Sequence, residues 1–177
     1  MSPLPTVLPV LSSQRLTLRP LADKDCESLF AIYGDPEVMR YASDPAFADL
    51  ATVRQMLDSV AQLLQQGESL EWGVVIADSG NLIGTCGLHS FDANHHTAEV
   101  GCMLARAAWG QGYMYEALSR LLTFARDDLG LQQLQADIDA PNQRSINLFT
   151  RMGFQWWEGS YYRLDLQSLR PLHRDGR

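Results

Sequence analysis

The spacing of apolar residues changes along the chain and predicts its secondary structure segment by segment. The segment RLTLRP alternates apolar and polar residues as a strand does. Apolar residues at positions 26, 29, 30 and 33 then share one helical face, with Asp23 as the expected N-cap and Gly34 as the end. A second helix is predicted after Asp49, because apolar residues recur there at spacings of three and four until Gly67.

The middle of the chain changes to the period of strands. EWGVVIA and LIGTCGLHSF read as strands joined by the turn sequence DSGN, and TAEVGCML reads as a third strand after the polar loop DANHH. Apolar positions from Ala117 to Leu129 describe a helix that ends at Gly130. The strand LQQLQADIDA, a short helix between Asn142 and Gly153, and a closing strand pair in FQWWEGSYYRLDLQSL complete the pattern.

The order of these elements predicts an α/β fold. One strand, two helices, three strands, a helix, a strand, a helix and two strands favour a mixed sheet with helices on both faces. The unit from TAEVGCML through the following helix to LQQLQADID is a strand-helix-strand crossover. Such a crossover is right-handed and makes its two strands parallel.

Composition is that of one globular domain, with 46% apolar and 20% charged residues in a chain of 177. We expect a flexible segment at residues 1–13, which contain three prolines, a domain at 14–170 and a tail at 171–177. No apolar run approaches the roughly 18 residues of a membrane span, and no basic region precedes the first apolar residues. Neither a membrane partner nor export is therefore expected.

Charge and cysteines narrow the class of protein further. A formal charge of -7 without a cluster of basic residues argues against binding nucleic acid, so an anionic ligand would need local donors. Cys26, Cys86 and Cys102 are odd in number and far apart within apolar segments. We interpret them as buried free thiols of a protein in the cytoplasm.

Two glycines stand where the helix near Ala117 begins, in WGQGYMYEAL. Gly110 and Gly112 remove side chains from the turn that precedes the first helical amides, which have no partner in the helix and carry its positive dipole end. This arrangement can bind a phosphate or pyrophosphate. Alternatively, the glycines only make a tight connection. The sequence matches neither a P-loop nor a dinucleotide fingerprint.

AEVGCMLARAAWGQGYMYEAL followed by APNQRSINLFTRMGF resembles the GCN5-related N-acetyltransferase (GNAT) superfamily, and in particular its RimJ/RimL-like branch, which acetylates ribosomal-protein N-termini. The resemblance extends to SSQRLTLRPLADKDCESLFAIYGDPEVMRYA and GNLIGTCGL and covers about residues 14–169. It implies a single GNAT domain with a mostly antiparallel sheet that splays apart at the cofactor site. It also implies a transferase, more narrowly an acyltransferase, that uses acetyl-CoA as co-substrate.

The resemblance assigns the cofactor site. The pattern Gln/Arg-x-x-Gly-x-Gly/Ala falls on Trp109, Gly112 and Met114, and departs from the family at two of its three defining positions. Because most contacts are through main-chain amides, binding is still expected, with Gly112 as the position that must lack a side chain. The pyrophosphate is expected on the segment of Trp109, Gly110, Gln111, Gly112, Tyr113, Met114 and Tyr115. The strand GCMLA is expected to bind pantetheine through Met103, Leu104 and Ala105, with the Met103 amide as oxyanion donor.

The remaining catalytic assignments also come from the resemblance, and each has a structural alternative. Glu99 matches a general base that acts through water, or is a solvated or salt-bridged carboxylate. Ser145 matches the residue that protonates or hydrogen-bonds the departing thiolate, or it bonds its own backbone. Asn142 binds the pantetheine arm or caps the helix. Phe149, a cofactor contact, stands where many members have a tyrosine acid, which excludes tyrosine chemistry there.

No metal is expected, since the adjacent His95 and His96 lack ligand spacing. We expect direct attack of an amine within a ternary complex, because Cys102 has no evident base. The favoured acceptor is the α-amino group of a protein or peptide. A small amine and a non-catalytic CoA sensor are the alternatives, and loops 35–48 and 89–97 would select the acceptor. Aromatic residues are expected at the acceptor cleft, in the core or at a homodimer contact: Trp72, Trp156, Trp157, Tyr161 and Tyr162.

Overall fold

The computed structural model describes residues 3–169, in which one sheet has the strand order β1-β2-β3-β4-β5-β6-β8-β7. The strands are β1 (Leu11–Ser12), β2 (Leu16–Arg19), β3 (Ser69–Ile76), β4 (Leu82–His89), β5 (Thr97–Leu104), β6 (Gln133–Asp137), β7 (Gln155–Glu158) and β8 (Tyr161–Asp165). The helices are α1 (Cys26–Tyr33), α2 (Leu50–Gln65), α3 (Tyr113–Asp127) and α4 (Gln143–Arg151), with short 3-10 turns at Asp23–Asp25, Arg106–Ala108 and Leu166–Ser168. The predicted order of elements is confirmed, and β1 is added to it.

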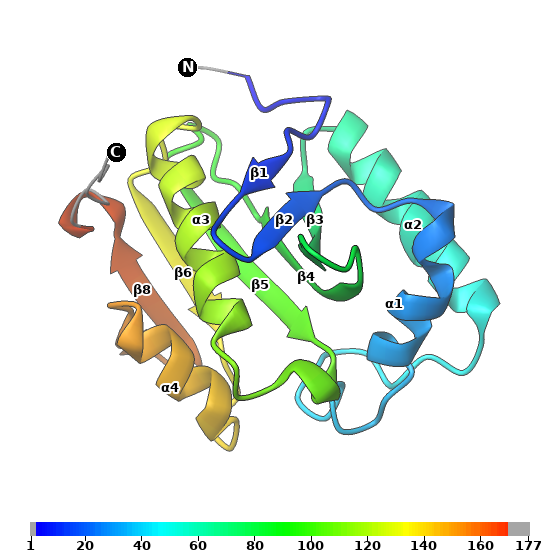
Figure 1. Ribbon diagram of the computed structural model, residues 1–177. Helices are drawn as coiled ribbons and strands as arrows, with labels where there is room; N and C mark the ends of the chain where they lie inside the picture. The colour runs from blue at the N-terminus through cyan, green and yellow to red at the C-terminus, as the bar shows by residue number, and fades with distance from the viewer. Residues whose placement is uncertain (1–2, 170–177) are drawn as a thin grey trace.

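The sheet opens between β5 and β6. All neighbouring strands pair antiparallel except these two, which are parallel as the crossover through α3 predicts. They pair only where Thr97, Ala98 and Glu99 face Gln133, Leu134 and Gln135, although β5 continues to Leu104. Figure 1 shows α3 in front of these strands and α4 in front of the lower end of β8. The end of β5 therefore has backbone groups that no neighbouring strand pairs.

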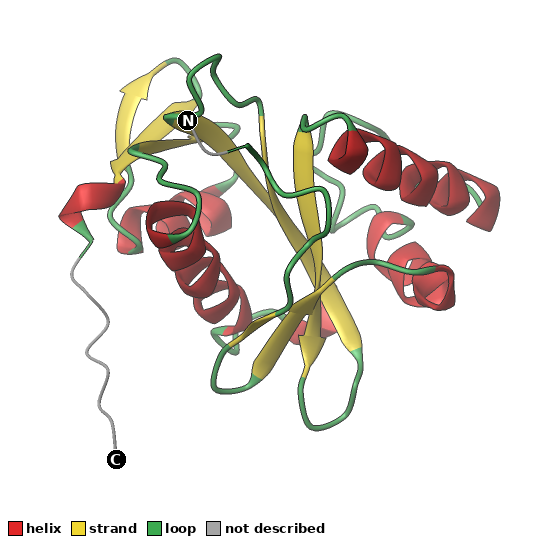
Figure 2. Cartoon of the chain, turned by 90° about the horizontal axis from the view of Figure 1, so that it is seen from above, coloured by secondary structure: helices red, strands yellow, loops and turns green. Residues whose placement is uncertain are grey.

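Helices cover both faces of the sheet, as expected for this α/β class (Figure 2). On one face α3 and α4 pack over a core that includes Trp72, Leu118 and Phe154, each at most 1% exposed. On the other face α1 and α2 bury Leu29 and Val53 against the sheet, both completely. Asp49 caps α2 as predicted, because its carboxylate accepts the Thr52 amide at 2.9 Å.

The start of the chain is packed from an earlier position than the sequence predicts. Leu8 and Leu11 are buried in the core, and the indole of Trp72 donates to the Pro9 carbonyl at 2.8 Å. The packed domain therefore begins before residue 14. The predicted tail at 171–177 lies outside the described residues.

The entry into α1 differs from its prediction. Asp23 begins a 3-10 turn and makes no capping bond, whereas Asp25 is 4% exposed and accepts the Ala22 amide at 2.9 Å. Both oxygens of Asp25 also accept hydrogen bonds of 2.8 Å from the Arg19 guanidinium. Burial opposes the charged carboxylate, but the bonds from Arg19 and Ala22 outweigh it and lower the pKa of Asp25. A two-pronged ion pair therefore fixes the start of α1, which a capping pattern could not reveal.

A buried polar cluster lies under α1. The Tyr33 hydroxyl and the Thr85 hydroxyl are 2.7 Å apart, and Thr85 also hydrogen-bonds Glu71. Burial raises the pKa of Glu71 to about 7, although the bond from Thr85 acts in the opposite direction. Burial also raises the pKa of Tyr33. The folded protein therefore favours a protonated Glu71.

The Glu71 cluster predicts a pH-dependent stability. A carboxyl whose pKa is raised in the folded state stabilises that state. The contribution is complete when the pH is below the pKa of the unfolded chain, and it is lost as the pH rises through the folded-state pKa of about 7. Relative to Glu71→Gln, the wild type should lose roughly 1 to 3 kcal/mol of unfolding free energy between pH 5 and pH 8. Urea unfolding of both proteins at the two pH values measures this. Parallel pH dependence of the two proteins would contradict it.

Candidate active site

A cavity of about 680 Å³ lies at the opening between β5 and β6. Its wall is formed by the loop after α1, the end of β5, the turn before α3, the end of β6 and the face of α4. Most of the predicted site residues line it: Glu99, Met103, Leu104, Trp109, Gly110, Gly112, Tyr113, Met114, Tyr115, Asn142, Ser145 and Phe149. Residues assigned from segments far apart in the sequence are thus brought to one cavity.

The turn before α3 presents free amides to this cavity. Gly110 and Gly112 have φ angles of 75° and 76°, which favour glycine at both positions rather than at Gly112 alone. Within residues 3–169, the amides from Gly110 to Tyr115 have no hydrogen-bond acceptor, and the first bonded amide of α3 is that of Glu116. These donors lie at the N-terminus of a 15-residue helix, where its dipole attracts an anion.

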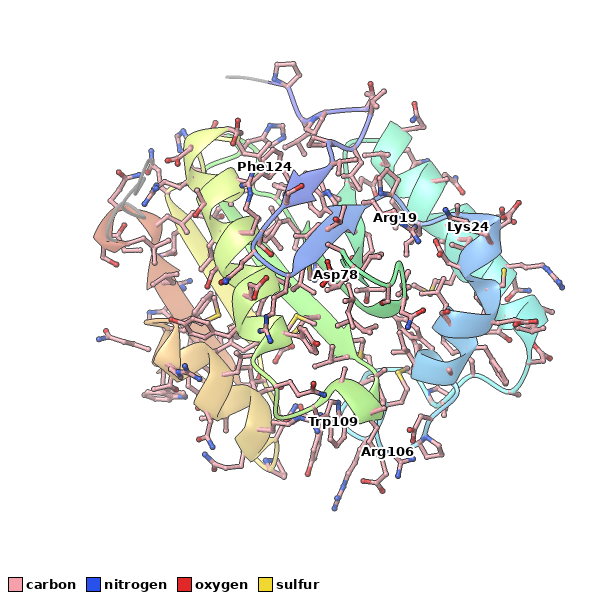
Figure 3. The ribbon with its side chains drawn as sticks, in the orientation of Figure 1. Arg19, Lys24, Asp78, Arg106, Trp109 and Phe124 are labelled. Atoms are coloured by element: carbon pink, nitrogen blue, oxygen red, sulfur yellow. The ribbon has the colours of Figure 1, made fainter. Side chains whose placement is uncertain are left out.

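Trp109 fixes the start of this turn. Its indole Nε1 donates to the Leu104 carbonyl at 2.8 Å and so ties the turn to the end of β5. The Arg144 guanidinium lies 3.1 Å from the centre of the indole ring. Figure 3 shows Trp109 in the segment that leads from β5 to α3, with Arg106 nearby. A tryptophan at the first position of the family pattern thus holds the turn through its ring and indole nitrogen.

Arginines surround the turn, which sequence reasoning missed. Three guanidiniums stack on its three aromatic rings, at 4.4, 3.1 and 4.5 Å from the ring centres: Arg15 on Tyr113, Arg144 on Trp109 and Arg151 on Tyr115. They come from the start of the chain and from α4, so no basic run marks them in the sequence. Arg144 and Arg151, which line the cavity, supply local positive charge where an anionic ligand would bind, against a net charge of -7.

Glu116 in the first turn of α3 would oppose an anion if it were alone. Its two carboxylate oxygens accept the Ser13 hydroxyl at 2.6 Å and the Arg15 amide and guanidinium at 2.8 and 2.7 Å. Partial burial disfavours its charge, but the bonds from Ser13 and Arg15 prevail and lower the pKa of Glu116. Arg15 also donates to the Gln111 carbonyl at 3.0 Å. The carboxylate is therefore neutralised by a residue that also braces the turn.

The register of β5 corrects the choice of Met103 as oxyanion donor. The Ala105 amide donates to the Ile83 carbonyl at 2.7 Å, and in an antiparallel pair such bonds recur at every second residue. The Met103 amide therefore faces Thr85 of β4. The amides of Cys102 and Leu104 face β6, on the side where the His96 carbonyl accepts from Gln133 at 3.2 Å. Since β6 has diverged at this point, these two amides are open to the cavity.

Two predicted contacts do not line the cavity. The Ala105 amide is used by Ile83, so it is unavailable to a pantetheine arm. The Gln111 side chain donates to the Ala107 carbonyl at 3.2 Å instead of facing the cavity. Both assignments followed from position in the motif, which gives no information on the direction of an amide or a side chain. The amide of Gln111 remains among the free donors of the turn.

Glu99 lies at the point where the two strands part, with its side chain 23% exposed. Its Oε1 accepts the Gln135 amide at 3.2 Å, and its Oε2 lies 3.9 Å from His89 Nδ1. The carboxylate is thus held on one oxygen by a neutral donor, whereas the other oxygen faces His89. His89, which sequence reasoning missed, also lines the cavity. The strand register alone accounts for the position of His89, because the register pairs His89 directly opposite Glu99.

The N-terminus of α4 supplies Asn142 and Ser145. Asn142 Oδ1 accepts a hydrogen bond from the backbone amide of Ser145 at 3.2 Å, so the Asn142 side chain caps the helix. Asn142 also lines the cavity. The Ser145 hydroxyl has no hydrogen-bond partner among the residues described and lines the cavity. The structure therefore contradicts the alternative in which the Ser145 hydroxyl hydrogen-bonds its own backbone.

The aromatic residues expected at the acceptor cleft lie elsewhere. Trp72 is fully buried in the core, Trp156 and Trp157 are 64% and 46% exposed, and none of the five candidates lines the cavity. Tyr33 and Phe47 line it instead, with ring centres 5.2 Å apart. The expected acceptor loop at 35–48 does contribute to the wall, through residues such as Tyr41 and Asp44. Among residues 3–169, no three metal-ligating side chains gather into a site.

The sequence matches the acetyltransferase (GNAT) domain family over residues 15–155. The N-acetyltransferase YoaA of Bacillus subtilis is 32% identical over 149 residues, which are 84% of each chain. The [ribosomal protein uS5]-alanine N-acetyltransferase of Escherichia coli is 21% identical over 150 residues, which are 82% of this chain and 77% of that protein. Homologues thus include ribosomal-protein acetyltransferases at modest identity.

Solved structures with the same fold include two that contain coenzyme A. Mycobacterium smegmatis RimJ in complex with CoA-disulfide superposes with a TM-score of 0.81 at 14% identity, over 94% of this chain and 92% of that chain. The spermidine N-acetyltransferase of Vibrio cholerae, in complex with CoA and spermine, has a TM-score of 0.74 at 18% identity, over 88% and 98%. At this identity the likeness concerns the fold alone.

The fold, the free amides before α3 and the family match define an acetyl-CoA-dependent N-acetyltransferase. The chain belongs to the GNAT acetyltransferase family. The helices described between residues 3 and 169 include none with the length and apolar content of a membrane span.

Proposed function

We propose that this enzyme acetylates the α-amino group of a protein or peptide. The observation that carries this proposal is one continuous cavity, which runs from the free amides at Gly110–Tyr115 past the open end of β5 to Glu99. The diphosphate of acetyl-CoA binds the amides of the turn and the two arginines of α4 beside it, Arg144 and Arg151. The pantetheine arm follows β5 and Asn142, and the thioester lies near the point where the strands part.

The transfer is a direct attack of the amine on the thioester carbonyl. Glu99 accepts the proton of the amine, directly or through water, and the amide of Cys102 or Leu104 stabilises the oxyanion. An α-amino group has a pKa of about 8, so a carboxylate base suffices, whereas lysine at about 10.4 is a harder acceptor. Ser145 donates its unengaged hydroxyl to the departing thiolate, whose thiol has a pKa of about 8.5.

Cys102 lines the same cavity but does not carry the acetyl group. Burial, followed by the charge of Glu71, raises the pKa of the Cys102 thiol to about 12. The thiolate is the nucleophilic form, so its population near neutral pH is negligible. A covalent acetyl-cysteine intermediate is therefore disfavoured, which supports attack within a ternary complex.

This account predicts that Cys102→Ala keeps its turnover. Only the side chain changes, so the backbone amide of residue 102 still donates, and we expect kcat within about threefold of the wild type. Thiol release from acetyl-CoA, followed with a chromogenic disulfide, measures the rate. A loss of about 100-fold or more with unchanged acetyl-CoA binding would favour a covalent route.

The acceptor is tested with matched peptides. We expect acetyl-CoA-dependent thiol release with a peptide that has a free N-terminus, and none with the same peptide when its N-terminus is blocked but a lysine is left free. Mass spectrometry locates the acetyl group. Acetylation of lysine alone would contradict the proposed acceptor.

A small polyamine is the second candidate, because Asp44, Glu99 and Asp137 line the cavity and a spermidine N-acetyltransferase shares the fold. Carboxylates along the cavity would attract an acceptor with several amines. Spermidine in the same thiol-release assay decides between the two acceptors through the ratio of their kcat/KM values. A cytoplasmic location is also proposed, supported by free thiols at Cys26, Cys86 and Cys102.

A further inference from the structure

A row of polar side chains crosses the sheet, and two of its members, His89 and Glu99, line the main cavity. The registers place His89, Glu99, Gln135 and Arg163 directly opposite one another on β4, β5, β6 and β8. Arg163 Nε donates to Gln135 Oε1 at 3.2 Å, and Gln135 Nε2 donates to Glu99 Oε1 at 3.2 Å. One oxygen of Glu99 is therefore anchored from the β6 side, and Oε2 is left for the acceptor and for His89.

His89 lies between two cavities. It lines the main cavity and also a second cavity of about 600 Å³, which lies between the end of α2 and the loop at 90–96. Its side chain is 44% exposed, and its Nδ1 is 3.9 Å from Glu99 Oε2 and 2.9 Å from the Ser90 hydroxyl. His89 Nδ1 thus faces Glu99, the proposed base, on one side and Ser90, a residue of the second cavity, on the other.

The second cavity has the polarity that water requires. Glu68, Ser69, Asp92 and His95 line it, and His95 Nδ1 is buried without a hydrogen-bond partner among the described residues. A buried nitrogen of this kind is normally satisfied by water when the space is polar and large enough. The second cavity therefore provides a place where a proton can reach solvent.

The loop beside this cavity is held in an unusual conformation. Ser90 and His95 are the two non-glycine residues with positive φ among those described, at 52° and 54°. A non-glycine residue in this region costs about 1 kcal/mol or more, so the surrounding structure must hold it there. At Ser90 this conformation places the hydroxyl against His89 Nδ1.

We propose that His89 relays the proton from Glu99 to water in the second cavity, an inference that rests on the proposed function. The acceptor amine gives its proton to Glu99 as the N–C bond to the acetyl group forms. The Glu99 carboxylic acid then gives this proton to His89 Nδ1, after the 3.9 Å separation shortens by about 1 Å to a hydrogen bond. The imidazolium releases its other ring proton, on Nε2, to water, and the carboxylate is restored. Exchange of the Nδ1 proton with water then returns the Nε2–H tautomer, so that Nδ1 can accept again in the next turnover. His89 acts through Glu99 and does not touch the reacting atoms.

Several titratable groups surround His89. Glu99 faces it from β5, and Glu68 and Asp92 line the second cavity with it. Glu71 lies two positions away along β3 on the same side of the sheet, but burial raises its pKa and favours its neutral form, which adds no charge. His95 is the other titratable group in that cavity. Nearby carboxylates stabilise a positive charge, whereas His95 would oppose it if protonated.

The test compares His89→Ala with His96→Ala in the peptide acetylation assay. His96 is at the end of the loop that follows His89 but lines neither cavity, so its variant controls for the loss of an imidazole. For His89→Ala we expect kcat to fall about tenfold at neutral pH, with unchanged melting temperature and unchanged acetyl-CoA affinity. Added imidazole should restore part of the rate in His89→Ala and have no effect on His96→Ala or on Glu99→Gln.

The outcomes separate the relay from the proposed function. Wild-type turnover with an unchanged pH profile in His89→Ala would overturn the relay and leave the function standing. A decrease that appears in acetyl-CoA affinity or melting temperature, without a response to imidazole, would also overturn it and make His89 a structural residue. If the wild type acetylates no amine, the proposed function fails and the relay fails with it.

Discussion

Replacing Gly112 with valine should weaken acetyl-CoA binding by about 100-fold, the loss of one or two charge-assisted hydrogen bonds. Gly112 has a φ of 76°, a region that is unfavourable for a residue with a Cβ atom and more so for a β-branched one. Relaxation of this strain would change the directions in which the free amides of Gly110–Tyr115 point. Isothermal titration of acetyl-CoA into the variant measures the effect.

Gly130 provides the matched control for this experiment. It also has a positive φ, 71°, with open space where a Cβ would lie, but it follows α3 at the opposite end from the turn. Gly130→Val should therefore lose stability by a similar mechanism and keep its affinity for acetyl-CoA. If Gly112→Val binds as tightly as Gly130→Val, the turn is not the diphosphate site.

Replacing Glu99 with glutamine should lower kcat about 100-fold or more while leaving acetyl-CoA affinity unchanged. Glutamine keeps the size of the side chain and its contact with Gln135, but it cannot accept a proton from an amine. Steady-state rates between pH 6 and 9 and a separate binding titration measure the two quantities.

Glu37→Gln is the control for the loss of one carboxylate. Glu37 belongs to the acceptor loop, is exposed and does not line the cavity, so its variant changes the net charge in the same way. We expect wild-type kcat from it. An equal loss of kcat and acetyl-CoA affinity in Glu99→Gln would mean that Glu99 maintains the opening between β5 and β6 rather than acting as base.

Both variants act on groups whose orientation depends on the sheet. Gly112 matters because the preceding strand β5 ends beside it, where the Trp109 indole is bonded to the Leu104 carbonyl. Glu99 matters because β6 pairs with β5 up to its own position and no further. The opening of the sheet therefore brings the anion site, the open amides of β5 and the proposed base to one cavity.

Local sequence signals predicted the elements because each signal acts within a few residues. Apolar residues at spacings of three and four can be buried only by a helix, and the glycines at positive φ mark where helices end or begin. The caps at Asp49 and Asn142 form as expected for the same reason. The pair of Arg19 and Asp25 was missed, since a salt bridge that replaces a cap leaves no pattern in the sequence.

The sequence by itself determined the order of elements, the glycine turn and the family resemblance, because hydrophobic period and turn chemistry are local properties of the chain. Only the tertiary structure decided which amides of β5 face the opening, that three distant arginines stack around the turn, and that His89 lies opposite Glu99. The arginines meet because the start of the chain and α4 pack beside the turn. The direction of the β5 amides and the position of His89 depend on strand register, and a shift of one residue would turn each side chain to the other face of the sheet. Register is set by the packing of the whole sheet, so no single segment of the sequence contains it.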